Sequence, residues 1–295
     1  MGSVIGVSAG ALIGPRAGWT HELSVIVRLS NTIAIDIEYK KFCEKLSNPG
    51  WKNCKMTAYH RIQDIHQALR VMPGGRILDV ATGGGSCIEW LVQGLPSYDA
   101  IIGVDNFVQP GKTSIFERDH IHFMQMDAHH LAFADASFDI VSIARSLHHM
   151  ADPRRVLAEM HRVLKPGGHC IIREMYRDHQ TEAQMTHVAM HDWWADIDTA
   201  LGVVHNKTFT RQRLVEMAEQ MGLSRLAFYD YADLDGDRRA PARIQELHVR
   251  HEQYLERAKN LPDIVSFQER GAALARRLDE IGILNATLLI VIGEK

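Results

Sequence analysis

Short apolar runs alternate with amphipathic stretches along most of this chain. The apolar runs predict buried strands, and several of them end in an acidic residue. They cover residues 76–79, 100–105, 121–124, 138–144, 169–174, 223–231 and 285–293. Apolar residues at helical spacing predict helices over residues 57–71, 87–94, 153–164 and 211–221. This alternation indicates an α/β fold, with helices on both faces of a mainly parallel sheet.

The same pattern divides the chain into an N-terminal extension, residues 1–56, which we expect to be partly flexible, and a domain over residues 57–295. Two stretches of the domain exceed what a bare sheet needs. We expect the polar and aromatic stretch around residues 175–210 to form a lid. The stretch around residues 242–282 predicts two helical pieces broken at Pro262. Its apolar stripes favour packing on the sheet, with a homodimer contact or a cap over the site as alternatives.

The first predicted strand ends in the glycine-rich turn Ala81-Thr82-Gly83-Gly84-Gly85. Glycine permits positive φ in a tight turn and lets a ligand approach the backbone. The helix that follows has unpaired N–H groups at its start, which can face a ligand. The turn therefore predicts a cofactor site.

Composition narrows the class of protein. Of the residues, 46% are hydrophobic and 23% are charged, and the formal net charge is −3, so no general attraction to nucleic acid or to an anionic membrane is expected. The four cysteines are widely spaced without a C-x-x-C pair, which favours reduced thiols in a cytoplasmic protein. The first residues lack a basic segment before an apolar core, so no signal peptide is expected.

Five segments, in this order and spacing, resemble the class I S-adenosylmethionine-dependent methyltransferases. They are Leu78–Gly85, Gly103–Asp105, Met126–Ala128, Ser137–Val141 and Ala158–Gly168. The resemblance covers about residues 58–232. It implies a seven-stranded Rossmann-like sheet whose last strand is antiparallel, inserted between the fifth and sixth strands. It also implies S-adenosylmethionine as cofactor, with S-adenosylhomocysteine as product, and a small-molecule methyl acceptor as partner.

One position departs from the common family pattern, which has glycine where this chain has Ala81. Alanine suits this turn if its φ is negative. The quinone-biosynthesis methyltransferases, which are of methyltransferase type 11, resemble this chain in having alanine there. We interpret Ala81 as a pointer to small-molecule substrates.

The resemblance also implies which residues bind the cofactor. They follow the first four strands and are Asp79, Ala81, Thr82, Gly83, Gly85, Asp105, Asn106, Asp127, Ala128, Arg145 and Ser146. Asp79 would orient the methionine ammonium, Asp105 would accept both ribose hydroxyls, and Asp127 would bind the adenine amino group. Arg145 and Ser146 would lie near the transferring methyl group.

Methyl transfer from a sulfonium is an in-line displacement, so a general base is needed only if the acceptor loses a proton. Ligands bind at the carboxyl ends of parallel strands, which favours His148, Glu174 and Tyr176 as catalytic residues. Further candidates for a general base are His149 after the fourth strand and, in the lid stretch, His187, His191 and His205. His187 and His191 lie four residues apart beside several aspartates, a spacing that can hold a metal. Because no H-E-x-x-H pattern is present, we predict no metal site.

Three questions stay open at this level. Trp193 and Trp194 could close over an acceptor or pack as a lid core. An NAD-dependent oxidoreductase is an alternative function, because Asp105 also suits an NAD ribose, although Ile88 stands where its fingerprint needs a third glycine. A non-catalytic S-adenosylmethionine-binding protein is the second alternative.

Overall fold

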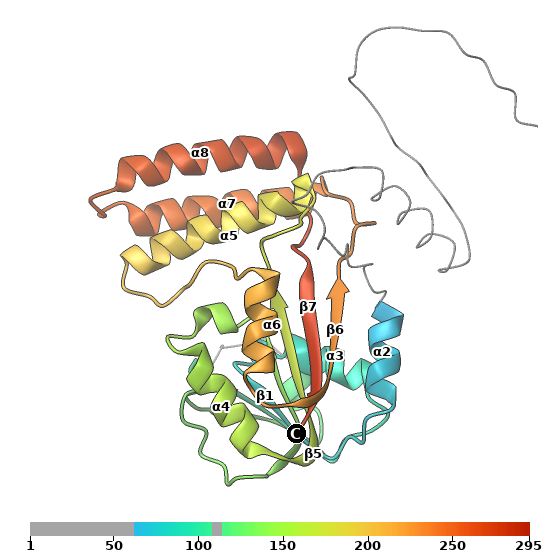
Figure 1. The fold of residues 1–295 in the computed structure, drawn as a ribbon. Coiled ribbons are helices and arrows are strands. Elements are labelled where there is room, and N and C mark those ends of the chain that lie inside the picture. The colour runs from blue at the N-terminus through green and yellow to red at the C-terminus, as the bar shows by residue number, and fades with distance from the viewer. Residues whose placement is uncertain (1–61, 108–113) are drawn as a thin grey trace, which may run out of the picture. The chain divides into compact units, whose positions relative to one another are not determined.

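The computed structural model describes residues 62–107 and 114–295, which belong to the unit Thr57–Lys295. Within them, seven strands form one sheet in the order β3-β2-β1-β4-β5-β7-β6 (Figure 1). The strands are β1 (Arg76–Val80), β2 (Ala100–Asp105), β3 (Ile121–Gln125), β4 (Phe138–Ala144), β5 (Leu164–Met175), β6 (Ser224–Tyr231) and β7 (Leu288–Glu294). β7 runs antiparallel to β5 and β6, and the other pairs are parallel. The predicted fold class is confirmed. The predicted extension, residues 1–56, lies outside the described residues.

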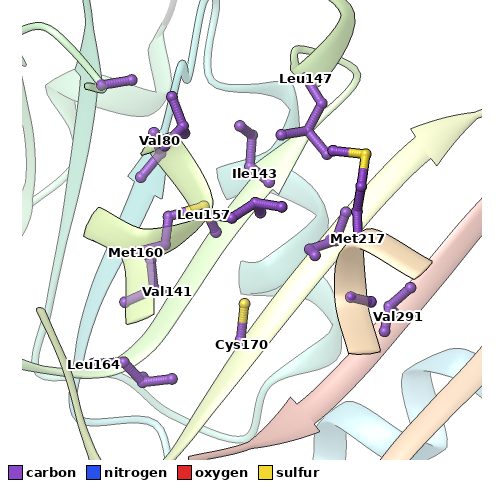
Figure 2. Close-up of a cluster of buried hydrophobic side chains, with 14 of the residues drawn as sticks. Val80, Val141, Ile143, Leu147, Leu157, Met160, Leu164, Cys170, Met217 and Val291 are labelled. Carbon is purple, nitrogen blue, oxygen red and sulfur yellow. The ribbon is translucent and has the colours of Figure 1, made fainter. Parts of the chain in front are cut away.

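Helices cover both faces of the sheet because successive strand side chains point to opposite faces. α2 (Ile62–Arg70) and α3 (Ser86–Gly94) cover one face, and α4 (Pro153–Val163) and α6 (Arg211–Glu219) cover the other (Figure 1). On β1, Ile77 packs into the core under α2 and α3, whereas Leu78 and Val80 pack into the core under α4 and α6. Figure 2 shows the second core, where Met160 of α4 and Met217 of α6 meet the strands.

The strand register brings polar residues into one row. Asp79 pairs with Gly103 of β2 on one side and with Ser142 of β4 on the other. All three lie near the carboxyl ends of their strands, which is where the glycine-rich turn begins. The sheet thus places this row directly beneath the predicted cofactor site.

The sequence predicts a turn after α4 at Lys165-Pro166-Gly167-Gly168, and in the structure this segment belongs to β5 instead. It forms a bulge inside β5, since Phe138 pairs with Leu164 while Ile140 pairs with His169. A Cβ at Gly168 would lie 2.8 Å from the carbonyl oxygen of Asp139, so only glycine fits there. Lys165 binds the Asp139 carboxylate at 2.8 Å and 2.9 Å across the bulge.

Three further helices form a layer beyond the carboxyl ends of the strands (Figure 1). They are α5 (Glu182–Ala200), α7 (Pro241–Ala258) and α8 (Ile264–Ile281). The apolar stripes of α7 and α8 pack with α5 in a core of their own instead of packing on the sheet, whereas Val188 of α5 also packs against Met175 of β5. α5 begins with a capping box formed by Thr181 and Gln184. Among the helices of the described residues, none combines the length and apolarity that spanning a bilayer requires.

Candidate functional site

The turn between β1 and α3 forms a cradle of residues with left-handed backbone. φ is +52° at Ala81, +51° at Gly83 and +79° at Gly85, the N-cap of α3. A Cβ at Gly85 would lie 2.5 Å from Cγ2 of the buried Ile115. The condition under which alanine suits this turn, a negative φ at Ala81, is not met, and an L-residue held there costs about 1–2 kcal/mol. The cradle thus contains one strained residue that the sequence does not reveal.

Asp79 supports the cradle from below. It is fully buried, and its carboxylate accepts hydrogen bonds from the hydroxyls of Thr82 at 2.7 Å and Ser142 at 2.6 Å. Burial raises the pKa of Asp79, although these two hydrogen bonds oppose the shift. Its clearest contribution in this structure is to fix Thr82 in the turn. A direct role at the methionine ammonium stays a prediction.

Asp105 connects the end of β2 to the cradle. Its Oδ2 accepts from the Gly83 N–H at 2.8 Å, and its Oδ1 accepts from the Phe107 N–H at 3.1 Å. Each carboxylate oxygen can accept a second hydrogen bond, so acceptor capacity remains for two hydroxyl donors. Gly103, two residues earlier, allows the close approach, since a Cβ there would lie 2.8 Å from Cγ2 of Thr82. The carbonyl of the predicted Asn106 accepts from the Gln125 amide at 2.9 Å.

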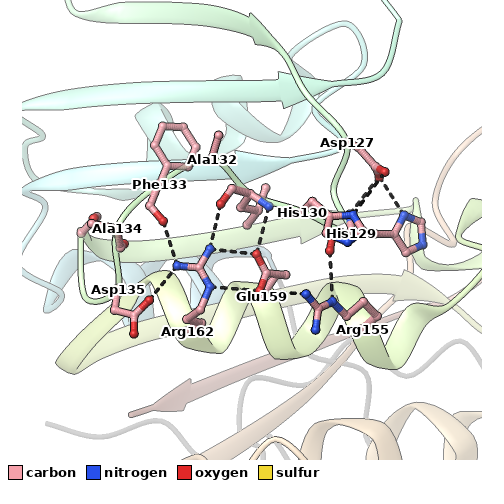
Figure 3. Close-up of polar contacts among 12 residues, drawn as sticks. Asp127, His129, His130, Ala132, Phe133, Ala134, Asp135, Arg155, Glu159 and Arg162 are labelled. Atoms are coloured by element: carbon pink, nitrogen blue, oxygen red, sulfur yellow. Dashed lines mark hydrogen bonds and ion pairs between the residues drawn. The ribbon is translucent and has the colours of Figure 1, made fainter.

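The segment after β3 carries the predicted adenine contacts. Asp127 is half exposed and accepts from the His129 N–H at 2.9 Å, with the His130 ring 3.7 Å away (Figure 3). The His129 backbone and ring lower the pKa of Asp127, which keeps it an anion and a hydrogen-bond acceptor. Ala128 is buried in the core under α4. The adenine-binding roles of Asp127 and Ala128 stay predictions.

Two side chains of α4 clamp this segment in place, a function that sequence reasoning missed. Glu159 accepts from the Leu131 N–H at 3.0 Å, and Arg162 donates to the carbonyls of Leu131 at 2.7 Å and Phe133 at 2.8 Å (Figure 3). Arg162 also binds Glu159 at 2.8 Å. The signal was available in the segment Ala158–Gly168, whose glutamate and arginine are three residues apart on one helix face.

Two residues that follow β4 form hydrogen bonds with the cradle and with the start of α3. Ser146 Oγ donates to the Ala81 carbonyl at 3.2 Å, and the Arg145 guanidinium donates to Ser86 Oγ at 3.3 Å. Arg145 has a φ of +50°, and its N–H donates to the Arg173 carbonyl at 2.7 Å. The structure therefore brings both predicted residues next to the turn, and their contact with the methyl donor stays a prediction.

The predicted catalytic residues Glu174 and His148 form a buried pair. Glu174 Oε1 lies 3.0 Å from His148 Nδ1, and its Oε2 accepts from the Leu147 N–H at 2.9 Å. This carboxylate fixes both the short helix Leu147–His149 and the orientation of the His148 ring. The pair thus connects the ends of β4 and β5.

His148 is one of four imidazoles gathered beneath α5. We call His148, His149, His191 and His205 the histidine cluster; one ring nitrogen from each lies within 4.8 Å of the others. His191 comes from α5 and His205 from the loop that follows it. Burial lowers the pKa of His191 and of His205, so both are neutral near pH 7. Helical spacing suggested His187 as the partner of His191, but their ring centres are 6.5 Å apart and His187 instead accepts from the Ala286 N–H.

The remaining predicted residues are buried in packing contacts. Tyr176 is 2% exposed, and its hydroxyl donates to Asp230 at 3.0 Å, so its catalytic role stays a prediction. Trp193 is fully buried between α5, α7 and α8, where its indole N–H donates to the Phe267 carbonyl at 3.1 Å. Trp194 belongs to the same core. Of the two alternatives for the tryptophans, the structure supports packing within the helical layer.

The cradle suits S-adenosylmethionine better than NAD. Carboxylates stand after β2 and β3, at Asp105 and Asp127, and the second of them has no place in the NAD fingerprint. The third glycine of that fingerprint, which allows close packing of helix and strand, is replaced by the fully buried Ile88. Both cofactors contain an adenosine, so Asp127 and Ile88 are the positions that favour S-adenosylmethionine over NAD.

Comparisons with known proteins agree with this geometry. Residues 78–172 match a family model described as a methyltransferase domain. A demethylmenaquinone methyltransferase of Renibacterium salmoninarum is 39% identical over 113 residues, which are 37% of this chain and 45% of that protein. A ubiquinone/menaquinone biosynthesis C-methyltransferase of Geotalea daltonii is 37% identical over 112 residues, covering 36% of this chain and 48% of that protein. The chain spans about half the length of these curated relatives.

Solved structures share the fold at low identity. The YcgJ protein of Bacillus subtilis has a TM-score of 0.50 at 17% identity, covering 79% of this chain and 97% of that chain. The [4+2]-cyclase SpnF has a TM-score of 0.51 at 21% identity, covering 83% of this chain and 85% of that chain. The second name illustrates that one fold can host different reactions.

Proposed function

We propose that this chain, which carries a class I S-adenosylmethionine-dependent methyltransferase domain, transfers the methyl group of S-adenosylmethionine to a small-molecule acceptor. The observation that carries the proposal is the Asp105 carboxylate, which binds the Gly83 N–H and ties the end of β2 to the glycine-rich cradle. That arrangement leaves acceptor capacity for a ribose at the start of α3.

Bound S-adenosylmethionine supplies an electrophilic methyl group on a sulfonium. The chain's own residues orient and shield the reactants. Asp105 would hold the ribose and Asp127 the adenine, while Arg145 and Ser146 close the end of β4 over the turn. Such positioning can supply up to ~7–11 kcal/mol of the barrier reduction in favourable systems. An acceptor that loses a proton requires a general base, and the residues predicted for that role are His148, Glu174, Tyr176 and His191.

Much of the part of the chain that would contact the acceptor lies outside the segment that matches the family model. The family model ends at residue 172, before α5, α7 and α8, so the names of the quinone methyltransferases do not fix the acceptor of this chain. We infer a small molecule because the site lies under a helical layer that has its own packed core. Quinone-type rings are the first acceptors to assay, since the relatives' names state that chemistry.

We also infer a cytoplasmic location and no nucleic-acid or membrane partner. The net charge of −3 supports the absence of a polyanionic partner. Cys87 and Cys170 are free and buried, and free thiols are usual in a reducing compartment. A homodimer stays a proposal that light scattering on the full chain would test.

Calorimetric titration with S-adenosylhomocysteine tests the cofactor. We expect wild type to bind it and Asp105→Asn to bind roughly 10- to 100-fold more weakly, because a charged acceptor for two hydroxyls is lost. The amide oxygen of the variant can still accept from the Gly83 N–H, so the cradle should keep its shape. Asp119→Asn, at an exposed carboxylate outside the cradle, is the matched control.

Binding of NAD in place of S-adenosylhomocysteine would refute the proposal and favour an oxidoreductase. Formation of S-adenosylhomocysteine from S-adenosylmethionine, measured across a panel of phenols, quinols, amines and thiols, tests turnover. Tight cofactor binding without turnover on any member of the panel would favour the non-catalytic alternative.

A further inference from the structure

The histidine cluster has the composition of a metal site. Three of its rings, those of His148, His191 and His205, are at most 7% exposed, and His149 is the exposed member. They come from three segments that only the fold brings together: the short helix after β4, α5, and the loop after α5. Four imidazoles in contact supply the nitrogen ligands that zinc, nickel, copper and iron prefer.

The spacing of the rings suits one ion. His191 Nε2 and His205 Nε2 are 3.2 Å apart. Two imidazole nitrogens on one tetrahedral zinc, each ~2.0–2.1 Å from it, are separated by about 3.3 Å. The four ligand atoms lie within 4.8 Å of one another, so closure around an ion needs only small ring movements.

Carboxylates already orient two of the rings. His205 Nδ1 lies 2.7 Å from Asp198 Oδ2, and His148 Nδ1 lies 3.0 Å from Glu174 Oε1. An ionised carboxylate accepts only, so each of these Nδ1 atoms carries a proton and leaves Nε2 with a lone pair. A carboxylate behind the ring is the usual support of a histidine that binds a metal.

The tautomer of His191 provides independent evidence. Since His205 Nε2 holds a lone pair, the 3.2 Å contact requires His191 to carry its own proton on Nε2. Its Nδ1 is then a buried lone pair, and no hydrogen-bond partner is present for it among the described residues. Such an orphaned buried atom is uncommon and needs an explanation.

A cation between the rings removes this conflict. Both Nε2 atoms can then bind the ion, and the His191 proton moves to Nδ1. That proton would face the Asp192 carboxylate, whose Oδ1 is 3.9 Å from Nδ1. Asp192 would then accept a hydrogen bond from His191 Nδ1, as Glu174 does from His148 and Asp198 does from His205.

We propose that the histidine cluster binds one divalent transition-metal ion, with Zn²⁺ the best match to a set of four imidazole ligands. His149, the exposed ring, is the ligand that water or an acceptor oxygen would displace, because open positions distinguish catalytic from structural zinc sites. The cluster starts two residues after Ser146, which binds the cradle. The ion would therefore orient an oxygen acceptor and lower the pKa of its hydroxyl, a role that rests on the proposed function.

The test uses the full chain after treatment with a chelator and dialysis. Titration calorimetry with ZnCl₂ and visible spectroscopy with Co²⁺ report binding without any methyl transfer. We expect one ion per cluster, at least a 100-fold loss of affinity in His191→Ala and His205→Ala, and a 10- to 100-fold loss in Asp198→Asn, whose carboxylate supports His205. His122→Ala, which removes an exposed histidine of β3, is the matched control and should bind as wild type does.

Failure of this proposal is separable from failure of the methyltransferase proposal. S-adenosylhomocysteine binding is measured on the same samples, and we expect it to persist in every cluster variant that keeps its circular dichroism spectrum. Zinc binding that is equal in wild type and in both histidine variants would overturn the site. An absence of Zn²⁺ and Co²⁺ binding to wild type would do the same, and would leave the four rings as a hydrogen-bonded proton relay.

Discussion

The close approach of Ile115 to Gly85 leads to a stability prediction with an internal control. Gly85→Ala places a Cβ at a φ of +79°, where it would lie 2.5 Å from Cγ2 of Ile115. The left-handed backbone costs about 1–2 kcal/mol for an L-residue. The contact adds about 1–3 kcal/mol, because Ile115 is fully buried and its branched side chain has few alternative rotamers. The free energy of unfolding should fall by roughly 2–5 kcal/mol in total.

Gly222→Ala separates the two causes. Gly222 has a φ of +71°, but nothing lies within 4 Å of the added Cβ, so only the backbone strain applies. The effect of alanine on the unfolded chain is the same in both variants and cancels in the comparison. In a domain of this size each kcal/mol shifts the melting temperature by about 2–4 °C. Gly85→Ala should therefore melt several degrees below Gly222→Ala in a thermal scan followed by circular dichroism.

The two variants should also differ in ligand binding. Gly85 is the N-cap of α3, so its displacement should weaken S-adenosylhomocysteine binding, whereas Gly222→Ala should bind as wild type does. Equal melting temperatures for the two variants would refute the argument, because they would mean that Ile115 does not oppose a side chain at Gly85.

Two further predictions concern the cradle and its clamp. Ala81→Gly should raise the free energy of unfolding by about 0.5–1 kcal/mol, because relief of the backbone strain at φ +52° exceeds the added entropy of the unfolded chain. A melting temperature below that of wild type would contradict the positive φ. Glu159→Gln should destabilise the protein by about 1–2 kcal/mol near neutral pH. Its hydrogen bond with Arg162 lowers the pKa of Glu159 from 4.5, so the contribution of the carboxylate is present above pH 4.5 and lost as the pH falls through the lower folded value. Urea unfolding of both proteins should show the gap shrinking below pH 4.5, and a gap that grows there would contradict this sign.

The sheet was predictable because its strands are self-contained apolar runs. Residues 100–105 and 138–144 have the same bounds in the prediction and in the structure, and the first strand extends one residue beyond its predicted end at Asp79. The packing of the helical layer was harder to predict from the sequence. Its stripes show that a face is buried, but they do not say whether the sheet or α5 covers it.

The site was predictable only where its residues follow strands. Asp79, Asp105 and Asp127 belong to segments of recognisable spacing, whereas His205 lies 57 residues after His148 with no pattern between them. Helical periodicity offered His187 as a neighbour of His191, and the loop after α5 supplied His205 instead. Long-range contacts of this kind depend on tertiary packing, which local patterns do not encode.

The antiparallel strand β7 has a consequence for how the chain reaches its fold during synthesis. It pairs with β5 from His169 to Met175, and among the described strands it is the neighbour of β6. Until β7 is synthesised, β6 has no neighbouring strand among the described residues, and β5 presents an open edge. An unpaired edge of this kind can pair with another chain. Pairings so distant in sequence also form slowly, so the nascent protein should depend on chaperones that shield strand edges until β7 is in place.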